Sequence, residues 1–336
     1  MRSPKIPQPR FTRLLPTVFA AVALIATDVI CAVPACAENP FDLLRQAIKA
    51  DGNVRYEARV EIVSREGGVT GGTVVQRILK DSANRHRTEV IAPPQLVGRL
   101  IISDGETEWE FHPRTRLVHQ RKMRPLSEVQ RLKLEQLDLV SDSLRLTYQG
   151  IATVAGRPCD VVSIRPQGDK VTRKQVWIDQ KTHIELRWER YDPSGRLTTR
   201  WTVTSIDFSP PTPPGAFTFT PPKGVKVWKI PAAERMSLAE AEKRIGFKAV
   251  LPSYIPPGYA FHRSDVGITV RGGRSALWLR YLNGVDSFSI FQSQRLKARP
   301  GPMPGATYWE AGGYSFLLVG RLSSRERQKI ADSVNP

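Results

Sequence analysis

The side chains that are best able to do chemistry are few and scattered along this chain of 336 residues. His112 and His119 lie on one expected hairpin, but two ligands without a third favour a solvated surface over a metal site. Glu106, Glu108 and Glu110 alternate at strand spacing, which could form a cation patch and is also typical of the wet face of an amphipathic strand. The remaining histidines, His86, His183 and His262, have no partner at a recognisable spacing.

Sequence motifs of known catalytic centres are missing. The chain has no G-x-S-x-G elbow, P-loop, H-E-x-x-H sequence or paired C-x-x-C. Cys159 is the one cysteine outside the first 37 residues, and its strand-like neighbours Val161 and Val162 favour a buried, inert thiol. A hydrolase would depend on Cys159 or on one of the histidines, and nothing singles one out. We therefore expect a protein that is not an enzyme and that needs no cofactor or metal.

Large aromatic residues offer binding chemistry instead. Trp188 and Trp201 occupy alternating positions on two segments joined by the turn Asp192–Gly195, which predicts adjacent antiparallel strands. On a curled sheet, five aromatic residues would form a concave apolar face suited to acyl chains, although packing on helices is the simpler role for each one separately. These candidates for an apolar cavity are Trp109, Phe111, Trp177, Trp188 and Trp201.

The balance of charge is strongly basic, with a formal net charge of +18 at pH 7. Such a balance favours anionic partners such as lipid headgroups, lipopolysaccharide phosphates or an acidic protein segment. Nucleic acid is set aside, because no run of five basic residues or known binding motif is present. Basic residues that could hold an anionic headgroup or partner, or simply form a solvated face, are Arg99, Arg114, Arg116, Arg121 and Lys122.

The first 37 residues have the pattern of an export signal. A basic start is followed by the apolar run Val18–Ala26 and by the small-residue site Ala35–Ala37, which predicts a mature chain from Glu38. Lipidation at Cys36 is a less favoured alternative, because Pro34 precedes the site. We expect a periplasmic or otherwise exported protein that is soluble after cleavage near Ala37 and peripheral to the membrane.

Two helices and a series of strands are expected in the domain spanning 38–224. Asn39 can cap a helix that runs to Gly52, and Ser127 can cap a second helix that ends at Val140. Alternating segments between and after these helices predict a long antiparallel meander. A sheet of this length must curl or be covered, and helices against one face would cover it.

Proline marks the end of the first domain. The segment Ser209–Pro214 is expected to form a stiff polyproline II connector, followed by a short strand at Phe217–Phe219 and a linker over 225–236. A smaller domain, 237–336, begins with the capping box Ser237–Glu240 and contains a hairpin signal at Asn283–Gly284.

These features together carry a resemblance. The segments resemble the LolA-like superfamily, and the added small domain makes the chain most similar to the RseB/MucB family of periplasmic regulators of an envelope-stress sigma factor. The segments concerned are Phe41–Ala50, 100–111, Gly156–Val162, Val176–Asp179, Tyr191–Arg196, 217–222, Leu251–Tyr259 and Ser287–Phe291.

The resemblance implies an α+β fold: an N-terminal half-open antiparallel β-barrel wrapped around helices and enclosing an apolar cavity, plus a smaller C-terminal α/β domain. Family members bind the periplasmic segment of a membrane anti-sigma factor and shield it from proteolysis, and lipid or lipopolysaccharide relieves that protection. The leading interpretation is therefore an exported regulator of this kind. The alternative is a periplasmic carrier of lipid or lipoprotein, which would not need the small domain.

Overall fold

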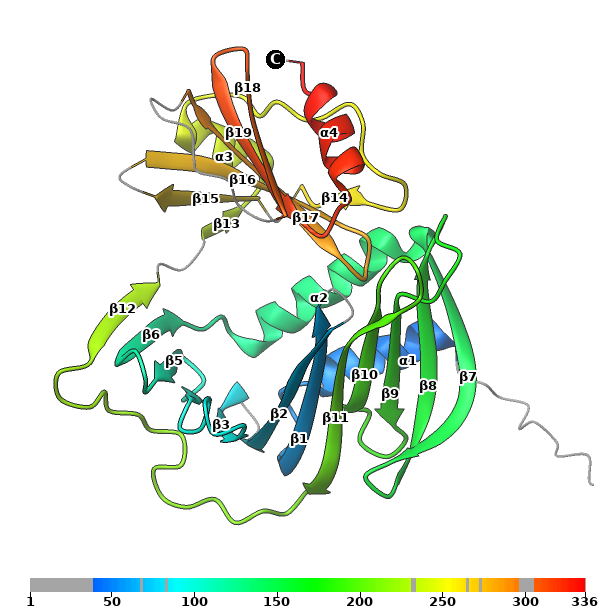
Figure 1. Ribbon diagram of the computed structural model, residues 1–336, viewed down its shortest axis with the longest axis vertical. Helices are drawn as coiled ribbons and strands as arrows, with labels where there is room; N and C mark the ends of the chain where they lie inside the picture. Colours follow the sequence, from blue (N-terminus) through cyan, green and yellow to red (C-terminus); the bar gives the residue numbers. More distant parts are fainter. Residues whose placement is uncertain are drawn as a thin grey trace, which may run out of the picture. The chain divides into compact units, whose positions relative to one another are not determined.

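The architecture consists of two β-sheets with helices. The computed structural model describes residues 39–66, 69–81, 84–230, 234–263, 266–271, 274–295 and 305–335, in which four α-helices accompany the sheets (Figure 1). The expected export signal and the Cys36 site lie outside these residues. Helices and a mainly antiparallel sheet confirm the α+β class.

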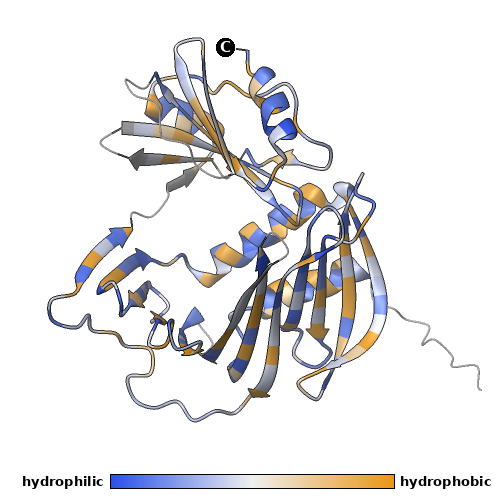
Figure 2. Cartoon of the chain, in the orientation of Figure 1, coloured by the Kyte–Doolittle hydropathy of each residue, from blue (hydrophilic) through white to orange (hydrophobic). Residues whose placement is uncertain are grey.

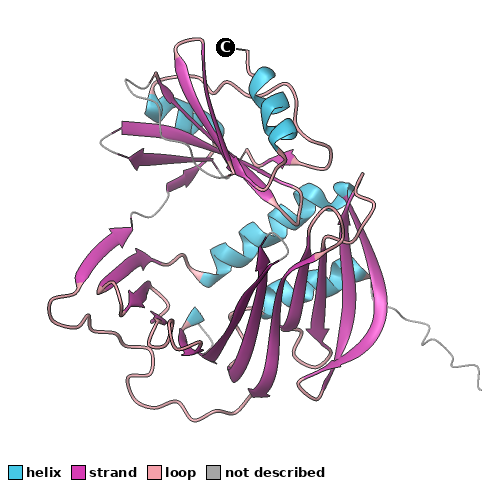
Figure 3. Ribbon diagram, viewed as in Figure 1, coloured by secondary structure: helices cyan, strands magenta, loops and turns pink. Residues whose placement is uncertain are grey.

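The larger sheet has twelve strands in the order β12-β6-β5-β4-β3-β2-β1-β11-β10-β9-β8-β7. Neighbouring strands are antiparallel except β12 and β6, which run parallel (Figure 3). Apolar and polar residues alternate along many strands (Figure 2). The expected half-open barrel is confirmed in part: the sheet is open, with β12 and β7 at the two ends of the strand order. The strands are β1 (Tyr56–Glu66), β2 (Val69–Lys80), β3 (His86–Ala92), β4 (Leu100–Ser103), β5 (Thr107–His112), β6 (Leu117–Lys122), β7 (Leu144–Val154), β8 (Arg157–Pro166), β9 (Lys174–Asp179), β10 (Glu185–Tyr191), β11 (Leu197–Asp207) and β12 (Lys226–Ile230).

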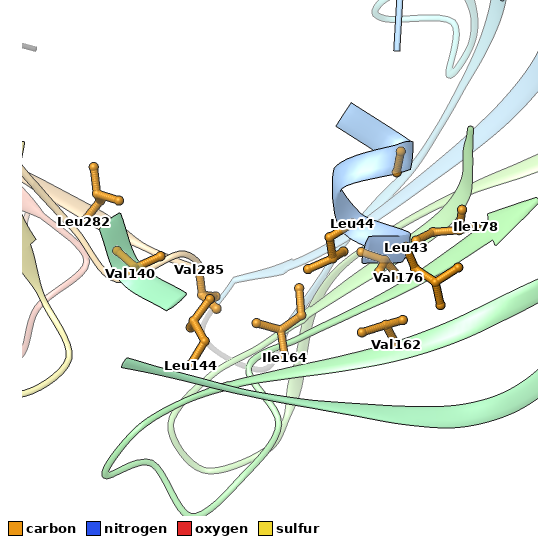
Figure 4. Close-up of a cluster of buried hydrophobic side chains, with 11 residues drawn as sticks. Leu43, Leu44, Val140, Leu144, Val162, Ile164, Val176, Ile178, Leu282 and Val285 are labelled. Atoms are coloured by element: carbon orange, nitrogen blue, oxygen red, sulfur yellow. The ribbon is translucent and has the colours of Figure 1, made fainter. Parts of the chain in front are cut away.

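Helix α1 (Pro40–Ala50) starts and ends where the sequence predicts. The Asn39 side chain accepts a hydrogen bond from the Phe41 N–H at 3.0 Å, Pro40 occupies the first turn, and Gly52 follows with φ +85°. The apolar side of α1 contributes to a core with side chains of β8 and β9, among them Val162 and Val176 (Figure 4). Burying this stripe fixes the helix on the sheet.

Helix α2 (Leu126–Val140) differs from the prediction at its start. Ser127 lies inside the helix, and Pro125 occupies the cap position without a side-chain hydrogen bond. Contact with α1 anchors the start of α2 instead: the Gln130 amide donates hydrogen bonds to the backbone oxygens of Lys49 and Asp51, each at 2.9 Å. These two acceptors lie at the end of α1, so Gln130 ties the helices together.

The proline-rich segment ends in a turn rather than in the expected strand at Phe217–Phe219. Phe219 packs against Trp109 and Phe111, with ring centroids 6.3 and 6.1 Å apart. Aromatic packing therefore holds this segment where ladder hydrogen bonds were expected.

The smaller sheet is antiparallel throughout, so the C-terminal region is not of the parallel type that the term α/β implies. Its strands follow the order β13-β15-β16-β17-β19-β18, with β14 paired to β16. Helix α3 (Leu238–Ile245) has the predicted capping box of Ser237 and Glu240, and α4 (Ser324–Asp332) is capped by Ser323. The strands are β13 (Glu234–Met236), β14 (Ala260–Phe261), β15 (Val266–Arg271), β16 (Arg274–Leu282), β17 (Ser287–Gln294), β18 (Ala306–Ala311) and β19 (Tyr314–Gly320).

The connection expected over 225–236 contributes strands of its own. β12 joins the large sheet, and β13 joins the small one. Further contact comes from the β16–β17 turn, where Leu282 and Val285 pack in the same core as Val140 and Leu144. Asp286 in this turn accepts a hydrogen bond from Arg173 at 2.8 Å. The two domain limits that the sequence suggests remain a prediction.

Candidate functional site

A cavity of about 970 Å³ lies among the two helices of the large sheet, strands β8 to β11 and the β16–β17 turn. Its size matches the pockets that hold small ligands. Helix α1 contributes apolar side chains because its amphipathic pattern turns these residues away from water, and Ile164 of β8 adds to them. The main apolar lining residues are Leu44, Ala47, Ile48, Leu137, Ile164, Ile184, Trp188 and Trp201.

Two tryptophans form a flat part of this lining. Trp188 in β10 and Trp201 in β11 are directly paired across the strands, and their rings are parallel within 2° with centroids 6.5 Å apart. Both line the cavity. A pair of aligned indoles gives an extended apolar surface, which suits a chain-like apolar ligand.

The charged residues of the lining are mainly basic, with six cations against three acids. The cations are Lys80, Lys133, Lys174, Arg190, Arg280 and Arg321, and the acids are Asp51, Glu185 and Asp286. Low-dielectric walls strengthen the field of such charges, so the excess of cations favours an anionic group at the cavity.

Asp51 partly neutralises two of the lysines. Its carboxylate oxygens lie 2.6 Å from Lys80 Nζ and 2.7 Å from Lys133 Nζ. Burial alone would raise the pKa of Asp51, but the two ammonium groups lower it to about 2. The acid is therefore ionised at neutral pH and balances one of the two positive charges.

Arg190 keeps more capacity for a ligand. Its guanidinium carbon lies 5.7 Å from the centre of the Trp188 ring, and its Nε is buried without a hydrogen-bond partner among the described residues. An unpaired buried donor is costly, so an acceptor on a bound molecule would stabilise it.

The structure divides the five predicted aromatic residues among three places. Trp188 and Trp201 line the cavity. Trp109 and Phe111 pack on Phe219. Trp177 is buried in a separate core, with the Arg187 guanidinium 4.4 Å from its ring centre. Ligand binding by any of them remains a prediction.

None of the five predicted basic residues lines the cavity. Arg99 is paired with Glu110, Arg121 with Glu108, and Arg116 donates to the Lys223 carbonyl at 2.9 Å. Arg114 and Lys122 are exposed. The cavity cations were missed because they come from strands and helices far apart in the chain. Their sequence neighbourhoods do not differ from those of other surface cations.

Cys159 is buried, as its sequence surroundings suggested. Burial raises the pKa of its thiol to about 12. A protonated, inaccessible sulfur is a poor nucleophile, which supports packing as its role.

The site consists of a curved sheet, two helices and an apolar cavity whose charged lining residues are mainly basic. The model of the MucB/RseB N-terminal domain matches residues 40–222. The chain belongs to the MucB/RseB family, as the sequence resemblance suggested.

Solved structures of this family share the fold. The complex of Pseudomonas aeruginosa MucA/MucB matches with a TM-score of 0.58 at 15% identity, over 89% of this chain and 99% of the other. MucB in complex with MucA(peri) matches with a TM-score of 0.57 at 16% identity and the same coverage. MucB without a stated partner gives 0.50 at 16% identity, over 88% and 97%. No curated protein sequence matches the chain.

Among the described helices, none has the length and apolar character that crossing a membrane requires.

Proposed function

We propose that this protein is an exported, non-enzymatic regulator that binds the extracytoplasmic segment of a membrane anti-sigma factor. Family membership over residues 40–222 carries this proposal. Two of the similar structures are complexes of MucB with MucA or MucA(peri), and the similarity covers 89% of this chain, both sheets included. The basic net charge of +18 is compatible with an acidic partner segment.

Binding would limit proteolysis of the partner by a simple physical route. Proteases cleave segments that are accessible and locally unfolded. A partner segment that is held against a folded surface is no longer accessible to the protease. The protein would then act as a shield and would not itself break or form a covalent bond.

The cavity would sense an anionic lipid or lipopolysaccharide. The paired rings of Trp188 and Trp201 and the aliphatic lining suit acyl chains, while the excess of cations suits phosphate groups. Arg190 combines both features, because it lies over the Trp188 ring and has an unpaired Nε.

The partner is tested by affinity capture of the tagged chain from Glu38 to Pro336 from solubilised envelopes. Proteins and lipids in the eluate are identified by mass spectrometry. Enrichment of a membrane anti-sigma factor supports the regulator. Many unrelated lipoproteins, or lipid alone, would instead support the periplasmic carrier, for which the same cavity is suited.

The ligand is tested with vesicles that contain or lack anionic phospholipid. Arg190→Gln should weaken binding to anionic vesicles about tenfold, since it removes one charge-assisted hydrogen bond. Arg114→Gln is the matched control, because Arg114 is exposed and does not line the cavity. Equal effects of the two substitutions would show that general surface charge, and not the cavity, attracts the lipid.

A further inference from the structure

Two histidines and a glutamate meet on the hairpin of β5 and β6, outside the cavity lining. Glu110 in β5 is paired directly with His119 in β6. His112 lies two residues beyond Glu110 in the same strand, so the strand period places it on the same face. The sequence contained this third candidate ligand, but spacing alone did not link Glu110 to both histidines.

The donor atoms of the three side chains are close together. His112 Nε2 lies 3.1 Å from Glu110 Oε1, and His119 Nδ1 lies 3.8 Å from Glu110 Oε2. One potential ligand atom from each residue lies within 4.8 Å of the others. In a tetrahedral site with bonds of about 2.0–2.2 Å, ligand atoms are about 3.4 Å apart, so small side-chain rotations would centre an ion between them.

The surroundings orient the carboxylate. Arg99 Nε donates to Glu110 Oε1 at 3.2 Å, which leaves Oε2 for an ion. Partners such as Arg99 commonly hold the carboxylate ligands of metal sites in a fixed orientation.

We propose that Glu110, His112 and His119 bind a divalent first-row transition ion such as Zn²⁺ or Cu²⁺. Two imidazoles and one carboxylate suit these ions and are a poor match for Ca²⁺ or Mg²⁺, which prefer all-oxygen sites. Three protein ligands leave at least one coordination position open for water or another ligand.

A neighbouring strand provides a reporter of this site. Trp228 in β12 is the direct partner of His119 in the β12–β6 register, and its side chain is 57% exposed. Neighbouring strands of a sheet lie about 4.7–4.9 Å apart, so Trp228 is close to His119. Bound Cu²⁺ should therefore quench the fluorescence of Trp228, and Trp228→Phe should remove most of the quenching.

The test uses the untagged mature chain after dialysis against EDTA, because a histidine tag would itself bind the ion. Isothermal titration with Zn²⁺ at pH 7.5 should show one ion per chain. His112→Gln and His119→Gln should each weaken binding at least about tenfold, a loss seen even for supporting residues of metal sites.

His86→Gln is the matched control. His86 pairs with Glu108, the neighbouring acid on the same face, at 3.3 Å but does not belong to the three-residue cluster. Unchanged binding in this variant supports the assignment. The proposal is overturned if His86→Gln weakens binding as much as His119→Gln, if both cluster variants bind like the wild type, or if Zn²⁺ shows no saturable binding below about 1 mM. Circular dichroism of each variant shows whether a loss comes from unfolding. Partner capture in EDTA tests the regulatory function separately.

Discussion

Asp179 ends β9, within the segment Val176–Asp179 that contributed to the family resemblance. Its side chain is fully buried, and it accepts hydrogen bonds from Arg157 Nε at 2.6 Å and Nη2 at 2.9 Å. The Thr182 backbone N–H and hydroxyl also donate to it, at 2.8 and 2.7 Å. We predict that Asp179→Asn, which keeps the shape but removes the charge, strongly destabilises the large sheet.

The size of the effect follows from what remains after the substitution. Removing one member of a buried ion pair costs about 3–5 kcal/mol, because the other charge is left uncompensated. The Arg157 side chain keeps 24% exposure and lies 4.6 Å from the Phe208 ring centre, so water and the ring compensate it in part. We therefore expect a loss near the lower limit, about 3 kcal/mol in the free energy of unfolding.

Urea unfolding at pH 7, followed by circular dichroism and tryptophan fluorescence, measures this loss. Asp138→Asn is the control, because Asp138 pairs with Arg45 at the surface, with side-chain exposures of 56% and 36%. Such a pair contributes about 0–1 kcal/mol. If Asp179→Asn costs no more than this control, the buried pair does not stabilise the sheet as argued.

The pH dependence of the free energy of unfolding shows whether the Asp179 carboxylate is the source of this stabilisation. Burial raises the pKa of Asp179, but the hydrogen bonds from Arg157 and Thr182 outweigh this and lower it below its usual value. A folded pKa below the unfolded value of about 3.9 means that the stabilisation is complete above about pH 5 and is lost as the pH falls through the folded pKa. The difference between wild type and Asp179→Asn should thus be constant from pH 5 to 7 and shrink below about pH 4. A difference that changes mainly near pH 6 would implicate a histidine instead.

Three further outcomes are expected. Cys159 should not react with a thiol reagent at pH 8 until urea unfolds the chain, because its pKa is raised to about 12 and it is buried; fast labelling of the folded protein would contradict this. Gly320→Ala should lower stability by about 1–3 kcal/mol, since a Cβ there would lie 2.4 Å from Phe288 Cβ, and Gly71→Ala, with its nearest atom at 3.3 Å, should cost less in the same urea titration. Ser237→Ala should cost about 1 kcal/mol by removing the capping box of α3, and an unchanged thermal midpoint would show that the cap is dispensable.

Elements controlled by local chemistry could be predicted from the sequence. The caps of α1 and α3 use side chains that bond to backbone a few residues away, so Asn39 and Ser237 were identified correctly. The segment Phe217–Phe219 was predicted wrongly, because its partners Trp109 and Phe111 are distant in the chain. The degree to which the sheet curls could not be derived from the strand pattern either, since alternation sets which face a residue occupies and not how near the outer strands come to each other.

The same limit applies to the candidate site. Alternation placed Trp188 and Trp201 on one face, and a short turn made them neighbours. Lys80 and Lys133 come from β2 and α2, and only their shared partner Asp51 brings them together. A long-range ion pair of this kind leaves no signal in a single sequence.

One face of the large sheet therefore carries two different kinds of surface. His119 and Glu110 lie on the same face of the sheet as Ile78 and Ala58, because direct cross-strand pairs connect them from β6 to β1. Ile78 and Ala58 pack in a hydrophobic core. Helices α1 and α2 bury apolar side chains along one part of this sheet, whereas β5 and β6 keep Glu110, His112 and His119 partly exposed. A sheet face that was solvated throughout, or packed on helices throughout, would not show this division. An apolar ligand in the cavity and an ion at the β5–β6 hairpin would each use the part of the sheet whose chemistry suits it, and substitutions at one site should leave binding at the other unchanged.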